Sequence, residues 1–171
     1  TVQCWGISGD GGTTPSPVIS AKSITAASNG AMCAIKTDDT VQCWGNAMHG
    51  ATTPSPVITA KSLTANTSAF CAIKTDDTVQ CWGAGGYGNV APSPTISAKS
   101  IASMGGGVCA IKLDDTVQCW GNASRGGTTP SPTITAKSLT SGFFAMCARK
   151  MDNTVQCWGD TAYGGTTPSP T

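Results

Sequence analysis

Short apolar stretches alternate with polar turn segments along the whole chain, and this alternation recurs with a fixed period. The hexapeptide Thr-Val-Gln-Cys-Trp-Gly begins at five positions spaced by 39, 38, 38 and 38 residues, namely Thr1, Thr40, Thr78, Thr116 and Thr154. Such a period is typical of stacked repeat architectures. We therefore expect a single repeat array over residues 1–171, with a period of about 38. The units are residues 1–39, 40–77, 78–115 and 116–153, and a partial unit at 154–171.

Each period contains four short apolar segments, which in the second unit are residues 40–44, 56–59, 61–65 and 69–74. They are bounded by Gly, Pro, Asn and Asp, as strands joined by tight turns are. Ile58 and Leu63 are an odd number of positions apart, so one regular strand cannot place both on the same face. We expect a turn or bulge near Ala60 and Lys61. The pattern predicts an all-β fold of short four-stranded antiparallel sheets.

Cysteines recur ten positions apart, on either side of a polar tip such as Thr37-Asp38-Asp39. If the tip is a three-residue hairpin loop, Cys33 lies directly opposite Cys43. The last residue of such a loop is normally left-handed, which Asp39 tolerates better than most residues do. Opposed cysteines at a non-hydrogen-bonded pair are close enough to bridge. Four hairpin disulfides are expected: Cys33–Cys43, Cys71–Cys81, Cys109–Cys119 and Cys147–Cys157.

The cysteine pairs also bear on the compartment, because disulfides persist where the surroundings are oxidising. We therefore expect an extracellular or cell-surface location. A zinc site is the weaker alternative, since there is no Cys-x-x-Cys and only one His; reduced, buried cysteines are the simplest alternative. Cys4 has no hairpin mate in the sequence. We expect it to bridge to an upstream segment or to a second chain.

The predicted hairpin has two apolar faces. Ile35, Val41 and the cystine share one face, whereas Met32, Ala34 and Trp44 share the other. A hairpin that is apolar on both faces should be sandwiched between neighbours. We interpret the tryptophans as spacers between repeats, with each indole N–H bonded to a backbone carbonyl. A platform on which sugars stack is the alternative interpretation.

The composition narrows the kinds of partner that the protein could bind. The chain has 25 Thr and no Glu, and its charged residues make up 11%, against about 25% in typical domains. The net charge of +1 gives no electrostatic footprint for nucleic acid or an anionic membrane. No apolar run approaches the roughly 18 residues of a membrane span. The partners we expect are the chain itself, other extracellular proteins or carbohydrate, with no nucleic acid and no membrane span.

Residues for catalysis are scarce. His49 is the only His, and general-acid Glu is absent. The paired Asp residues at the hairpin tips supply fewer oxygen ligands than the roughly six to eight that a calcium ion requires. The Gly-rich run at residues 83–88 precedes no predicted helix, so it does not fit a phosphate loop. We expect no catalytic, cofactor or metal site, and therefore no enzyme.

The segment Thr-Thr-Pro-Ser-Pro recurs between the hairpins and is expected to form an extended linker that protects a sheet edge. Ser and Thr mixed with Pro are also associated with O-glycosylation. Asn66 and Asn122 begin N-glycosylation sequons. The O-glycosylation candidates are Thr13, Thr14, Thr52, Thr53, Thr128, Thr129, Thr166 and Thr167.

The run Cys-Ala-Ile-Lys-Thr-Asp-Asp-Thr-Val-Gln-Cys-Trp-Gly-Asn resembles the regulator of chromosome condensation repeat, and more closely its secreted bacterial relatives with paired cysteines. The resemblance implies a β-propeller with one four-stranded blade per repeat, about five blades if completed. The period here is shorter, and the family's Gly-Gln-Leu-Gly segment is reduced to forms such as Gly126-Gly127-Thr128-Thr129. An open stack of sheets is the alternative. The nucleotide exchange of the founding member does not carry over to this chain.

The function that these features favour is a non-catalytic extracellular structural or adhesive repeat module, as part of a glycosylated surface fibre. The alternative is a carbohydrate-binding propeller lectin with one shallow site per blade. Sites in every blade should repeat in sequence, yet the residues after each Trp-Gly differ, as in Met48-His49, Gly86-Tyr87 and Ser124-Arg125. The scaffold is therefore the favoured interpretation.

Overall fold

The computed structural model describes residues 1–6, 14–15, 17–46, 53–54, 56–83, 95–122, 129–130, 132–160 and 162. These residues form no α-helix, and the predicted all-β fold is confirmed. Twelve strands make four sheets of three: β1 (Ala21–Ala26), β2 (Ala31–Lys36) and β3 (Val41–Gly45); β4 (Ala60–Ala65), β5 (Ala69–Lys74) and β6 (Val79–Gly83); β7 (Ala98–Met104), β8 (Gly107–Lys112) and β9 (Val117–Gly121); β10 (Ala136–Ser141), β11 (Ala145–Lys150) and β12 (Val155–Gly159).

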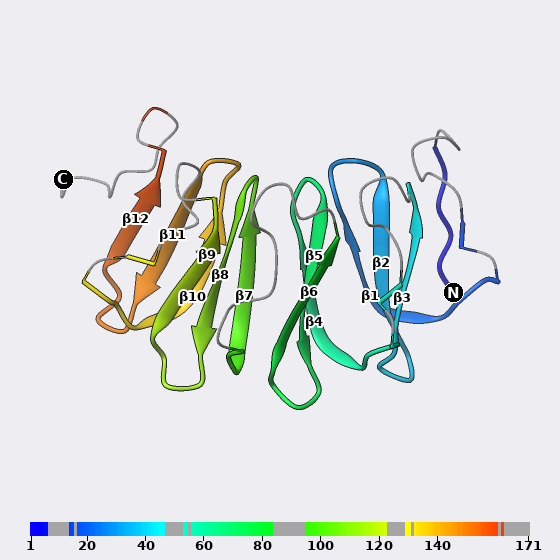
Figure 1. The fold of residues 1–171 in the computed structure, drawn as a ribbon, viewed down its shortest axis with the longest axis horizontal. Coiled ribbons are helices and arrows are strands. Elements are labelled where there is room, and N and C mark those ends of the chain that lie inside the picture. The colour runs from blue at the N-terminus through cyan, green and yellow to red at the C-terminus, as the bar shows by residue number, and fades with distance from the viewer. Residues whose placement is uncertain are drawn as a thin grey trace.

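The four sheets stand side by side in a row that does not close on itself (Figure 1). Within each sheet the strands follow chain order and pair antiparallel, as a simple meander. The turns between first and second strands lie along one edge of the row, and the hairpin tips between second and third strands lie along the opposite edge. The architecture is therefore an open array of the kind that the sequence left as an alternative to a closed propeller.

The hairpin register agrees with the prediction. Cys33 lies opposite Cys43 and Ile35 opposite Val41, so the loop between them has three residues. Asp39 has a φ of 69°, and the same value occurs at Asp77, Asp115 and Asn153. The left-handed slot at the end of each loop is therefore filled by the residue types that tolerate it best after Gly.

The predicted fourth strand, residues 56–59, is reduced to a single bridge between Thr40 and Thr59. Around it, the Val41 N–H donates to the Ile58 carbonyl at 3.0 Å, and the Ala60 N–H donates to the Asp39 carbonyl at 2.9 Å. Proline has no N–H to give to a ladder, and prolines at positions 54 and 56 precede this short bridge. Each sheet therefore has three strands where four were expected.

The same bridge is the passage from one sheet to the next, because β4 begins at Ala60, directly after it. The register of β4 on β5 shifts between Ala60 and Ser62. This is the bulge predicted from the odd spacing of Ile58 and Leu63. It lets Ile58 and Leu63 pack in the same hydrophobic cluster although they are an odd number of positions apart.

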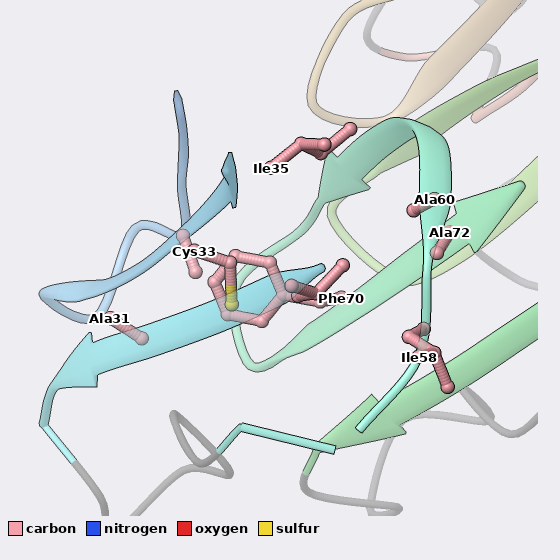
Figure 2. Packing of buried hydrophobic residues seen from close by; sticks show 9 residues of the cluster. Ala31, Cys33, Ile35, Ile58, Ala60, Phe70 and Ala72 are labelled. Carbon is pink, nitrogen blue, oxygen red and sulfur yellow. The ribbon is translucent and has the colours of Figure 1, made fainter. Parts of the chain in front are cut away.

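The hydrophobic core lies between the sheets. At the first interface, Cys33 and Ile35 from β2 pack in one cluster with Phe70 from β5 (Figure 2). The third interface repeats this arrangement, with Cys109 from β8 packed with Met146 from β11. At these two interfaces the cystine face of one sheet therefore packs against the face of the following sheet that carries Phe70 or Met146. At the second interface Cys81 packs in one cluster with Ala98 and Trp120 of the following sheet. This confirms that the hairpin is sandwiched between neighbours.

The tryptophans at the ends of the third strands pack at these interfaces, as the spacer interpretation predicts; they are Trp44, Trp82, Trp120 and Trp158. The predicted hydrogen bond from the indole to a backbone carbonyl is wrong. All four Nε1 atoms are buried and find no acceptor among the described residues. The physical reason is that ladder carbonyls lie in the plane of each sheet, whereas the indoles project out of that plane.

The cystine face of the last sheet, β10–β12, differs from those of the other three sheets. Arg149 stands where the other hairpins have Ile35, Ile73 and Ile111, and its side chain is exposed. Val155 in the same sheet is 45% exposed, whereas its equivalent Val41 is 1% exposed. Among the described residues no sheet covers this cystine face, so a cation is tolerated there.

This contrast predicts the outcome of a reciprocal pair of substitutions. Ile111 is 1% exposed, so Ile111→Arg buries an unpaired charge and should cost more than about 3 kcal/mol or prevent folding. Arg149→Ile should change the free energy of unfolding by less than about 0.5 kcal/mol. Urea unfolding of the oxidised protein, followed by tryptophan fluorescence, measures both. Equal effects of the two substitutions would contradict the stacking order.

Candidate functional site

Every complete hairpin contains a disulfide between its two strands. The pairs are those predicted from the loop register: Cys33–Cys43, Cys71–Cys81, Cys109–Cys119 and Cys147–Cys157. In each pair the two Cα atoms are 4.0 Å apart. The cystines of the first three sheets lie at the interface with the following sheet. The bond that closes the hairpin is thus also part of the inter-sheet core.

Cys4 lies at the opposite end of the row and bonds to no described cysteine. The segment that carries it runs beside Ile19, whose carbonyl accepts a hydrogen bond from the Val2 N–H at 2.8 Å. Cys4 packs with Val2, Ile19 and Trp44. It therefore occupies the place that Cys43 has in the next unit, and its bridging to another segment or chain stays a prediction.

A threonine hydroxyl holds the outer edge of the third strand. The Cys43 N–H donates to Thr53 Oγ1 at 2.9 Å, and the Thr53 hydroxyl donates back to the Cys43 carbonyl at 3.4 Å. We call this pair of hydrogen bonds the threonine latch. The same latch joins Cys4 to Thr14 and Cys119 to Thr129. Its spacing of ten residues in each case was visible in the sequence, but the hydroxyl's role was not predicted. The side chain replaces the backbone partner that the proline-rich segment cannot supply.

The latch bears on the predicted O-glycosylation. In Thr14, Thr53 and Thr129 the hydroxyl is engaged with the backbone of a cysteine. A glycan on any of these oxygens would break those bonds, so this geometry opposes modification there. The other O-glycosylation candidates lie outside the described residues: Thr13, Thr52, Thr128, Thr166 and Thr167.

The two predicted sequons differ in their surroundings. Asn66 is 6% exposed, and its Oδ1 accepts hydrogen bonds from the N–H groups of Ser68 and Ala69 at 3.0 Å. A glycan on Asn66 is incompatible with this packing. Asn122 is half-buried, and its backbone N–H donates to the Gly106 carbonyl at 2.7 Å. Glycosylation of Asn122 stays a prediction.

The first three hairpin tips present the same charged arrangement, and the fourth has Asn153 in place of the second aspartate. Asp38 accepts hydrogen bonds from the Thr40 hydroxyl at 2.6 Å and the Thr40 N–H at 3.0 Å, with the Lys36 Nζ 3.4 Å away. The Thr40 hydroxyl, its N–H and then Lys36 lower the pKa of Asp38 to about 2. Asp39 pairs with Lys22 at 2.6 Å. Each carboxylate of the tip therefore already has a partner within the same sheet.

The described residues contain neither a cluster of metal ligands nor a membrane-spanning helix. Within the described part of the chain, no three His, Cys, Asp or Glu side chains come together to hold a metal ion. No described helix is long and apolar enough to cross a membrane. His49 and residues 84–88, which the sequence raised as candidates for chemistry, lie outside the described residues.

No protein-family model and no curated protein sequence matches the chain. Solved structures do match it. The ectodomain of the receptor kinase CR4 from Physcomitrella patens is 21% identical, with a TM-score of 0.66 over 88% of this chain and 42% of that one. The CRINKLY WD40 ectodomain of ACR4 from Arabidopsis thaliana is also 21% identical, with a TM-score of 0.64 over 84% and 58%.

A third similar structure is Prp20p from Saccharomyces cerevisiae, described elsewhere as yeast RCC1. It is 15% identical, with a TM-score of 0.63 over 93% of this chain and 54% of that chain. At these identities the likeness shows the fold alone, which supports the resemblance to the chromosome condensation repeat at that level. The chain spans about half the length of these three structures.

The tip geometry predicts how the aspartates titrate. Their pKa values are lowered, so the stability they supply is present above the ordinary value of 3.8 and is lost as pH falls towards about 2. Carboxyl NMR should give midpoints of about 2 for Asp38 and Asp76. Thr40→Val should raise the pKa of Asp38 only, with Asp76 as the internal control. A midpoint that does not move in Thr40→Val would contradict the assigned cause.

The threonine latch predicts a stability effect. Thr53→Val keeps the shape of the side chain but leaves the Cys43 N–H without its partner, which should cost about 1–3 kcal/mol of unfolding free energy. Thr64→Val is the matched control, because the Thr64 hydroxyl makes no hydrogen bond among the described residues; its effect should stay below about 0.5 kcal/mol. Both are measured by urea unfolding. Similar values for the two variants would rule out the latch.

Proposed function

We propose that the chain is a non-catalytic extracellular repeat module with a structural or adhesive role, which assembles with itself or with other extracellular proteins. The observation that carries the proposal is the disulfide in each hairpin at the face that packs on the next sheet. The covalent bond and the stacking contact support one another. This arrangement is expected of a module that provides a stable surface for contacts and catalyses no reaction.

The disulfides matter because each sheet is small. A three-stranded sheet needs neighbours for stability, and each disulfide adds about 2–4 kcal/mol. Such bonds form and persist in oxidising compartments. Two of the similar solved structures are receptor-kinase ectodomains. These points support an extracellular location.

The repeated tips support the adhesive part of the proposal. The tips line one edge of the row (Figure 1), and three of them carry the same Lys–Asp pairs. Identical surface groups at regular intervals favour multivalent contacts, in which several weak interactions act together. A glycosylated surface fibre belongs to the same proposal and rests on the sequence. The lectin alternative, with one site per repeat, is less favoured because the repeated tryptophans pack between the sheets.

The first test concerns the compartment. Protein isolated from its native source, with free thiols trapped at lysis, should show all eight hairpin cysteines oxidised, and peptide mapping should recover only the four pairs within hairpins. Cys4 should be bridged to a segment resembling Phe70-Cys71-Ala72-Ile73-Lys74, from an upstream stretch or a second chain. Reduced hairpin thiols in the native material would contradict the extracellular assignment. A freely alkylated Cys4 would remove its proposed part in assembly.

The second test concerns adhesion. Beads coated with the oxidised chain should be retained under flow on a surface coated with the same chain or with extracellular matrix protein. Beads coated with reduced and alkylated chain are the matched control and should wash off, because the stacked surface depends on the cystines. Release of both kinds of bead at the rate of uncoated beads would contradict the adhesive role.

A further inference from the structure

The turns between the first and second strands of the four sheets line an open hollow of about 300 Å³. Every sheet contributes to it, through Ser28 after β1, Thr67 after β4, Gly105 after β7 and Phe143 after β10. These turns lie along the edge of the row opposite the hairpin tips (Figure 1). The hollow is therefore a product of the whole array, present once, and not a feature of the single repeat.

Contacts between the turns hold this hollow in shape. The Gly105 N–H donates to the Phe143 carbonyl at 2.8 Å, and the Thr67 hydroxyl donates to the Gly105 carbonyl at 3.5 Å. A Cβ at Gly105 would lie 2.8 Å from the Phe143 carbonyl oxygen and 2.9 Å from its Cε1. Glycine thus allows the third and fourth turns to meet. A site that is formed before the ligand arrives pays less ordering entropy on binding.

The wall of the hollow is uncharged but polar. None of its lining residues is Asp, Glu, Lys, Arg or His. Hydroxyl side chains on the wall come from Ser28, Thr67 and Ser141, and those of Ser28 and Ser141 are exposed. A ligand with its own hydroxyl groups can hydrogen-bond to these accessible side chains from within the hollow.

One side of the hollow is aromatic. Phe143 is 52% exposed, and Phe144 meets its ring edge to face at a centroid distance of 4.6 Å. An exposed ring beside hydroxyl groups suits a molecule with an apolar C–H face and a polar rim. Binding sites combine an apolar surface with a few placed polar groups in this way.

We propose that this hollow binds one neutral sugar ring, such as the terminal hexose of a glycan. The C–H face of the ring would lie on Phe143, and its hydroxyls would bond to Ser28 and Ser141. Its volume is at the small end of ligand pockets, which begin at about 300 Å³, so it suits one ring. An anionic sugar is disfavoured because the wall offers no cation to offset the loss of water.

The sequence of the turns agrees with a site that exists once. The second and third strands are nearly identical from unit to unit, whereas the turns at residues 27–30, 66–68, 105–106 and 142–144 share no common pattern. A site in every blade requires repeated residues. A single site to which each unit contributes a different wall requires the turns to differ, as they do.

The test is a titration of the full oxidised chain with methyl glycosides of neutral hexoses and N-acetylhexosamines, followed by NMR shift changes and calorimetry. We expect saturable binding of a neutral glycoside with one site per chain, and binding of methyl glucuronide or a sulfated hexose at least about tenfold weaker. Phe143→Ala should weaken binding at least about tenfold, while Phe143→Tyr should retain it. Trp5→Ala, which removes an aromatic side chain that is 87% exposed elsewhere, should leave affinity unchanged.

Ser141→Ala separates binding from structure. The Ser141 side chain is exposed and its hydroxyl makes no hydrogen bond among the described residues, so its removal should leave the melting temperature unchanged. Affinity for the glycoside should nevertheless fall roughly three- to tenfold, the value of one neutral hydrogen bond. The proposal is overturned by the absence of saturable binding of every neutral glycoside, by binding that survives Phe143→Ala, or by four equivalent sites per chain.

Discussion

The rest of the structure depends on the packing of the cystine face of each of the first three sheets against an apolar face of the following sheet. A three-stranded meander that is apolar on both sides is not stable alone in water. Stacking removes Ile35 and Val41 of one sheet and Phe70 of the next from solvent at the same interface. Because the two faces differ, sheets add in one orientation only. The order of the array therefore follows from a two-residue alternation within the strand.

Other features follow from this stacking. The chain must leave one sheet and enter the next within a few residues, and it does so through the bridge at Thr59 and the bulge after Ala60. The prolines before that bridge leave the edge of the third strand without backbone partners, and the Thr53 hydroxyl supplies one. The tips and the opposite turns are left at the two edges of the row, where sequence can vary without disturbing the core. The charged tips of the first three sheets are alike, whereas the turns at the opposite edge differ from unit to unit.

Features that repeat and are local could be predicted from the sequence: the period, the hairpin register, the left-handed Asp39 and the bulge near Lys61. Each depends on spacing within one unit. Features that depend on contacts between units escaped prediction. Prolines reduce the expected fourth strand to a single bridge, and the indoles project out of the sheet planes in which the expected carbonyl acceptors lie. The hollow beside Phe143 gave no signal at all, because its walls come from four unlike turns.

The most direct test of the stacking is the measurement of nuclear Overhauser effects between sheets in the oxidised protein. The account predicts contacts from the Phe70 ring protons to the β protons of Cys33, and from the Met146 methyl group to those of Cys109, since each pair lies in one packed cluster. Contacts of both kinds would show that the cystine faces of the first and third sheets meet the sheets that follow them. Their absence, with the hairpins still folded and bridged, would contradict the account.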